Sequence, residues 1–368
     1  MRKLAVLTMV LALMLSWSVP ARAEGIPQVD RALEWLSTNQ QADGGFTSGF
    51  SDGSDLGATT EAVLAFAAAG VNPDADTSPL AYLETQVASG TLSDAAGLSR
   101  AVMMAKALAA DPRAIGGKNL VAALLGTQDK ATGRFGDSLY AHAYALLALH
   151  NAGESLPAAA VELLINEQQE AGGWAMLGGD EVADTNTTSL AVQALLAAGE
   201  EPAAKKAIAY FKSVQNPDGG FPWQNPSPYG TDTDANSTAV VLQTLVALGE
   251  DLANWAPEGA SPVDALLALW DAESGAYNWQ LAMPGANVLA TAQAVQALSG
   301  MTLLDFSAPK TPLFAATATA PVATPAPAVT LAPVPVLPAS GGHAPGVLLL
   351  WAGAALLGTG LLLRRHQA

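Results

Sequence analysis

The chain of 368 residues contains no cysteine and few basic residues. Without a thiol it can form no disulfide, iron–sulfur cluster, thiolate zinc site or cysteine nucleophile. Only 16 residues are Lys or Arg, against 33 Asp and Glu, and the formal net charge is −17. All 33 acidic residues lie between Glu24 and Asp305. Because a surface this acidic repels a phosphate backbone, we expect no nucleic-acid partner.

Residues 1–23 have the pattern of a secretory signal peptide. The segment combines a basic start, an apolar run and a small-x-small cleavage site, found at Arg2-Lys3, residues 4–15 and Ala21-Arg22-Ala23. We therefore expect an exported mature chain that begins at Glu24. An uncleaved N-terminal anchor is the alternative.

The other end of the chain has the pattern of a stalk and a membrane anchor. Residues 307–346 alternate Pro with Ala, Thr and Val, a composition that cannot bury a core and favours an extended spacer. Residues 347–363 carry no charge and precede the basic tail 364–368. This order predicts a short transmembrane helix with a cytoplasmic tail.

A pentapeptide inside the stalk resembles the LPxTG signal cut by sortases, with serine in place of threonine. It reads Leu337-Pro338-Ala339-Ser340-Gly341. The resemblance implies attachment to a bacterial cell wall, whereas a plain membrane anchor is the alternative. In both cases we expect the segment 24–306 to be displayed on a bacterial cell surface, with the membrane as a partner.

Between these ends a unit of about 45 residues recurs six times. Each unit has a first helix, a turn with Gln, Gly and an aromatic residue, a loop and a second helix. The best-preserved turns run from Gln41 to Phe46, from Gln169 to Trp174 and from Gln215 to Phe221. A period of this length with two helices per unit indicates an array of helical hairpins.

The second helices are apolar almost all round, whereas the first helices are amphipathic. Helices of the first kind lie inside a fold, and those of the second kind cover it. The sequence therefore predicts an all-α domain, a single (α/α)6 toroid of six hairpins, with an open solenoid as the alternative. The six predicted inner helices span 55–69, 97–110, 138–151, 184–198, 234–248 and 287–298.

The Gln–Gly–aromatic turn followed by an Asp-x-x-x-Thr helix resembles the repeat of one superfamily. This repeat occurs in the prenyltransferase, squalene–hopene cyclase and transcobalamin-type toroids, and the resemblance covers residues 26–300. It implies an α/α toroid with prenyltransferase-like repeats. It does not select one activity, because this superfamily contains unrelated chemistries.

Parallel inner helices bring their N-termini, with free N–H groups and positive dipole ends, to one mouth of the ring. We expect a polar rim around an apolar cavity there, which is the usual construction of a small-molecule site. Helix capping alone is the alternative for the polar residues, and core packing is the alternative for the aromatic ones. The predicted ligand-binding residues are Asp55, Thr59, Asp184, Asn186, Thr188, Asn236, Thr238, Asn287, Thr291, Trp223, Trp279, Tyr140 and His142.

The favoured hypothesis is a non-catalytic site for an apolar or mixed-polarity small molecule. The transcobalamin resemblance implies a corrinoid as one possible ligand, and an isoprenoid is another. We expect no metal and no cofactor, because the zinc site of protein prenyltransferases needs a cysteine that this chain lacks.

Two enzyme hypotheses remain beside binding. Resemblance to squalene–hopene cyclases implies an acid that protonates an alkene, with Asp232 and Asp234 as the catalytic residues. Aligning the cyclase motif on Thr238-Ala239 places Asn236 at the position of the acid, and an amide cannot donate that proton. Shifting the alignment by two residues places Asp232 and Asp234 on the motif but loses its last Asp. Alternatively, Asp184 together with Asp232 or Asp234 could cleave a glycan as paired carboxylates. A display or protein-binding role is the fourth hypothesis.

Overall fold

The computed structural model describes residues 26–49, 52–71 and 78–305. Twelve α-helices in this part of the chain form six consecutive hairpins. The first helices of the hairpins are α1 (Pro27–Thr38), α3 (Pro79–Ser89), α5 (Leu120–Gly126), α7 (Ala158–Asn166), α9 (Glu201–Val214) and α11 (Pro262–Ala268). The second helices are α2 (Leu56–Ala68), α4 (Ala95–Ala107), α6 (Leu139–Asn151), α8 (Thr185–Ala197), α10 (Ala235–Ala247) and α12 (Val288–Leu298).

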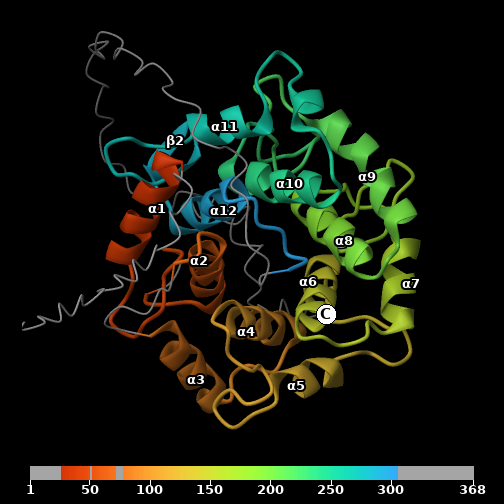
Figure 1. Cartoon of the computed structure of the whole chain (residues 1–368). Helices are drawn as coiled ribbons and strands as arrows, with labels where there is room; N and C mark the ends of the chain where they lie inside the picture. The colour runs from red at the N-terminus through yellow and green to blue at the C-terminus, as the bar shows by residue number, and fades with distance from the viewer. Residues whose placement is uncertain (1–25, 50–51, 72–77, 306–368) are drawn as a thin grey trace, which may run out of the picture.

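The second helices form a closed inner ring, and the first helices surround it (Figure 1). Each inner helix packs against the next one in the chain, and α12 packs back against α2. The predicted toroid is therefore confirmed, and the open solenoid is wrong. The predicted inner helices agree with the observed ones to within two residues, except at the end of α4, which lies at Ala107 rather than at residue 110. The helix begins at Ala95, two residues before the predicted start at Gly97, because Asp94 is its N-cap.

The inner helices are buried on nearly all sides, as their apolar composition predicts. In α8 every residue from Thr185 to Leu195 is buried, and α2 is buried in the same way. Burial of each large apolar side chain contributes roughly 1.5–3 kcal/mol. Ring closure therefore rests on apolar packing between neighbouring inner helices.

The glycines of the repeated turn let one hairpin approach the next. Three of them have positive φ and stand where a Cβ atom would lie 2.2–2.5 Å from a backbone carbonyl oxygen of the following hairpin. The turn of one hairpin thus packs directly on the first helix of the next hairpin, or on the residues just before that helix. A side chain at this position of the turn would collide with that backbone, which explains why glycine recurs in it. The pairs are Gly44 with Ser78, Gly172 with Lys206, and Gly219 with Ala260.

Two described elements were not predicted from the sequence. A β-hairpin of β1 (Asn278–Gln280) and β2 (Met283–Ala286) precedes α12, and a short 3-10 helix, Leu252–Trp255, follows α10. After α12 the chain turns across the ring at the C-terminal end of the inner helices (Figure 1). Asn151 Nδ2 donates to the Leu303 carbonyl at 2.8 Å, and Gln193 Oε1 accepts from the Leu303 N–H at 2.7 Å.

The signal peptide, stalk, sorting signal and transmembrane helix predicted over 1–23 and 307–363 lie outside the described residues. Within the described ranges, no helix has the length and apolar character needed to cross a bilayer. These predictions stay predictions.

Candidate functional site

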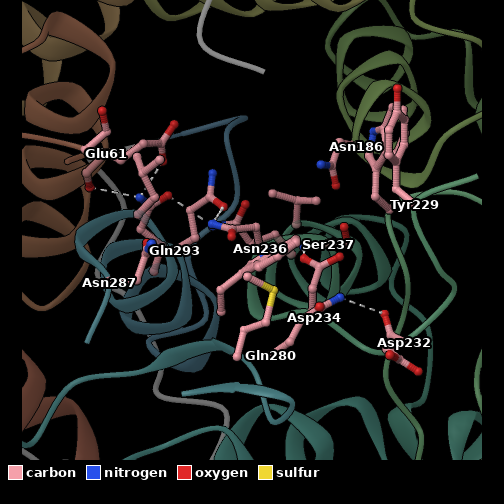
Figure 2. A pocket seen from close by; sticks show the side chains of 18 of the residues that line it. Glu61, Asn186, Tyr229, Asp232, Asp234, Asn236, Ser237, Gln280, Asn287 and Gln293 are labelled. Carbon is pink, nitrogen blue, oxygen red and sulfur yellow. Dashed lines mark hydrogen bonds between the residues drawn. The ribbon is translucent and has the colours of Figure 1, made fainter. Parts of the chain in front are cut away.

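A cavity of about 470 Å³ lies inside the ring and opens where the inner helices begin (Figure 2). All six inner helices contribute to its lining, together with the loops before α2, α10 and α12. Leu303 lines it at the opposite end, where the chain after α12 crosses the ring. A volume of about 300–1,000 Å³ is typical of small-molecule sites. The cavity is therefore large enough for such a ligand.

The structure brings eight of the predicted site residues together in this lining. They come from the inner helices and from the loops that precede them. They are Tyr140, Asn186, Trp223, Asp232, Asp234, Asn236, Trp279 and Asn287. The other seven predicted residues, Asp55, Thr59, His142, Asp184, Thr188, Thr238 and Thr291, lie outside the lining.

The predicted acidic and amide residues at the starts of the inner helices are N-caps. In each, a side-chain oxygen accepts a hydrogen bond from the backbone N–H three residues later, at 2.7–2.9 Å. Asp234 and Asn287 also line the cavity, so capping and rim positions coincide there. The four caps are Asp55, Asp184, Asp234 and Asn287.

The predicted threonines fix the repeated turn. Each hydroxyl accepts a hydrogen bond at 2.9–3.0 Å from the backbone N–H of the aromatic residue in its own repeat. The pairs are Thr59 with Phe46, Thr188 with Trp174, Thr238 with Phe221, and Thr291 with Tyr277. The threonine thus ties the turn to the inner helix.

His142 has the same position and the same function in the third repeat. Its Nδ1 accepts from the Phe135 N–H at 3.0 Å, and its Nε2 lies 2.9 Å from the Ala160 carbonyl oxygen. Burial lowers the pKa of His142 to about 4, so the ring is neutral and Nε2 carries the proton. His142 is a structural substitute for threonine.

Replacement of Thr188 by Val should lower the unfolding free energy by about 1–3 kcal/mol, because the buried Trp174 N–H loses its acceptor. Urea denaturation followed by circular dichroism measures the change. Thr188→Ser retains the hydroxyl and is the matched control. Equal destabilisation by the two variants would contradict the assigned hydrogen bond.

The sequence predicted only Asn236 of a polar cluster that lies inside the ring. Gln296 Nε2 donates to Glu61 Oε2 at 2.8 Å and to the Glu61 carbonyl at 2.9 Å, while its Oε1 accepts from Gln243 at 3.2 Å. Asn236 Nδ2 donates to Gln293 Oε1 at 2.7 Å (Figure 2). The available signal was the presence of long polar side chains inside otherwise apolar inner helices.

Arg100 lies beside this cluster, on α4. Its guanidinium carbon is 5.7 Å from the ring centroid of Tyr144, and Tyr140 stacks on Tyr144 with the centroids 6.3 Å apart. Burial raises the pKa of Glu61, although the Gln296 hydrogen bond and the Arg100 charge oppose the rise. The wall of α2, α4 and α6 thus combines the carboxyl of Glu61, the guanidinium of Arg100 and the phenol groups of two tyrosines.

Two buried carboxyls near the mouth have raised pKa values. Burial raises the pKa of Asp184 to about 7 and that of Asp234 to about 6, although backbone N–H groups donate to both. A buried charge is poorly solvated, so both groups hold a proton more tightly than an exposed carboxyl does. Of the two, Asp234 lines the cavity and can exchange a proton with a ligand there.

Two buried polar atoms of the lining have no hydrogen-bond partner in the described part of the chain. They are Tyr144 Oη and Trp223 Nε1. Burial raises the pKa of Tyr144 well above its usual value, so its hydroxyl keeps its proton. Both can donate a hydrogen bond to a ligand. No group of three potential metal ligands occurs among the described residues.

Fold and cavity together define an α/α toroid with an internal site of small-molecule size. The prenyltransferase alpha-alpha toroid domain matches residues 1–98 and 138–259, and the chain belongs to this family. The match omits α5, α11, α12 and all of α4 after Leu98, which the structure nevertheless places in the same ring. A sequence comparison with curated proteins gives no significant match.

Solved structures with the same fold include a terpene cyclase and a glycosidase. The type II terpene cyclase MstE from Scytonema, in its apo form, is 15% identical, with a TM-score of 0.56 over 74% of this chain and 96% of the cyclase. A variant of that enzyme, 16% identical with the same TM-score over 74% and 95%, contains geranylgeranyl dihydroxybenzoate as substrate. A glycosidase variant in complex with glucose is 13% identical, with a TM-score of 0.53 over 76% and 97%. At these identities the likeness shows the fold.

Proposed function

We propose that the toroid binds a small molecule of mixed polarity in the cavity inside its ring. The observation that carries this proposal is a single cavity lined by all six inner helices, with aromatic residues at its mouth and a hydrogen-bonded polar cluster at depth. Sites of this kind combine apolar walls with a few polar groups that orient the ligand.

The mouth offers apolar and aromatic surface. Trp223 and Tyr229 lie with ring centroids 6.2 Å apart, and Trp279, Met283 and Leu289 also line the cavity. Tyr229 is 49% exposed and Met283 52% exposed, so part of this surface is free in the described chain. An isoprenoid chain or the edge of a corrinoid would pack against these rings and aliphatic groups, and the binding need not include catalysis.

Catalysis by an acid at the mouth is the second candidate. Asp234 lines the cavity with a pKa raised to about 6, and Asp232 lines it two residues earlier. A carboxyl that is partly protonated near neutral pH can act as a general acid. A terpene cyclase-like isomerisation or a glycosidase-like cleavage would use this group, and the two enzymes with the same fold supply the analogy.

The same proposal includes display of the toroid at a bacterial surface. Residues 347–363 would anchor the chain in the membrane, and a sortase cut after Ser340 would join it to the cell wall. The support is the sequence pattern of the two ends. Fractionation of the producing cell, followed by immunoblotting, tests it. Recovery in the envelope fraction is expected, and recovery in the cytosol would contradict it.

Native mass spectrometry of the purified chain after incubation with a lipid and corrinoid extract tests the function. We expect a retained mass equal to that of an input compound, unchanged after long incubation. A new mass isomeric with, or smaller than, an input compound would establish the enzyme instead. In that case Asp234→Asn should abolish the product, because an amide keeps the N-cap acceptor but cannot donate the proton.

A further inference from the structure

The cavity lining contains hydrogen-bond donors that no described residue satisfies. Tyr144 is 3% exposed, and the indole nitrogen of Trp223 is buried too. A buried donor left without an acceptor costs about 1–3 kcal/mol. A hydrocarbon in this cavity would displace water and leave both donors unsatisfied. A ligand with oxygen atoms would pair with them.

The charges of the lining disfavour an anionic ligand. Three carboxyls line the cavity, those of Glu61, Asp232 and Asp234, against one guanidinium, that of Arg100. The whole chain is acidic as well, with a net charge of −17. A phosphate or diphosphate inside the ring would face this excess of negative charge in a poorly solvated space.

The same lining offers acceptors as well as donors. The carboxyl of Glu61 is held by Gln296, and the amide of Asn236 is held by Gln293, so both are fixed by hydrogen bonds within the ring (Figure 2). Hydroxyl groups are suited to such a lining because each can donate and accept at once. A neutral hydroxyl group also adds no charge beside the guanidinium of Arg100.

We propose that the ligand carries a neutral polyhydroxylated group, a sugar or polyol unit, seated inside the ring. Its oxygens accept from Tyr144 and Trp223, and its hydroxyls donate to the acceptors around Glu61. Any apolar part of the ligand lies against the aromatic mouth. This inference rests on the proposed small-molecule site and names the ligand class that the site selects.

Three probes with the same six-carbon tail test the head-group selection on the full chain. They are hexyl β-D-glucoside, hexyl phosphate and hexane, and saturation-transfer NMR with titration gives their affinities. We expect the glucoside to bind at least tenfold more tightly than the phosphate and more tightly than hexane. Tyr144→Phe should weaken glucoside binding about five- to tenfold, the loss of one hydrogen bond.

Tyr277→Phe is the matched control, because its buried hydroxyl also has no described partner but lies outside the lining. It should leave glucoside binding unchanged, and Trp223→Phe, which removes the indole N–H but keeps an aromatic ring, replaces the Tyr144 variant if that one fails to fold. Equal or tighter binding of hexyl phosphate or hexane would overturn the head-group inference alone. Absence of binding by all three probes would overturn the small-molecule site itself.

Discussion

Replacement of Gly172 by Ala is expected to lower the unfolding free energy by roughly 3–5 kcal/mol, because two costs coincide. Gly172 has φ of +93°, a conformation that strains any residue with a Cβ atom. The added Cβ would lie 2.2 Å from the carbonyl oxygen of Lys206 in α9. The backbone of the next hairpin would have to move, and urea denaturation followed by circular dichroism measures the loss.

Gly179→Ala is the matched control in the same loop. Gly179 has φ of +65°, and a Cβ atom there would meet no atom within 4 Å. Only the backbone strain of about 1–2 kcal/mol should remain. If the two variants lost equal stability, the close contact between consecutive hairpins would not explain the repeated glycine.

The second large effect is a loss of stability as the pH rises, caused by the buried cap Asp184. Its pKa is about 7 in the folded chain, against 3.8 for an ordinary Asp. Between these values the unfolded chain has released the proton and the folded chain still holds it, so the unfolding free energy falls with rising pH. Each pKa unit corresponds to about 1.4 kcal/mol, which gives a loss on the order of 4 kcal/mol that is complete above pH 7.

Asp184→Asn should flatten this part of the profile. The amide oxygen can accept from the Thr187 N–H as the carboxylate does, and Asn287 caps α12 in the same way. Urea denaturation at pH 4.5 and at pH 8 should show a smaller decrease for the variant than for the wild type. Asp94→Asn, at the exposed cap of α4, controls for the loss of one negative charge. An unchanged decrease in Asp184→Asn would contradict a buried, protonated carboxyl.

The ring could be predicted because its signals are local and repeated. The apolar character of 184–198 and 234–248 on all sides identifies inner helices without any knowledge of their neighbours. The spacing from Asp184 to Thr188 likewise marks a helix start. What the spacing could not show is the direction of the threonine side chain. It points to the repeated turn, because the Trp174 N–H lacks another acceptor.

The depth of the candidate site was less predictable than its mouth. Glu61 and Gln296 are 235 positions apart, and only ring closure between α2 and α12 joins them. The crossing of the ring by Leu303 depends in the same way on Asn151 and Gln193, which belong to α6 and α8. Pairings of this kind leave no periodic trace in a sequence. A single polar residue in an apolar helix is their one visible sign.

The interior of the ring as the ligand site is tested most directly with a variant that fills it. Leu190 lies on α8, is 3% exposed and lines the cavity, so Leu190→Trp should occupy ligand space. Native mass spectrometry after incubation with the same extract should show a bound mass on the wild type and none on a folded Leu190→Trp chain. Undiminished retention by that variant would place the ligand outside the ring and contradict the proposed site.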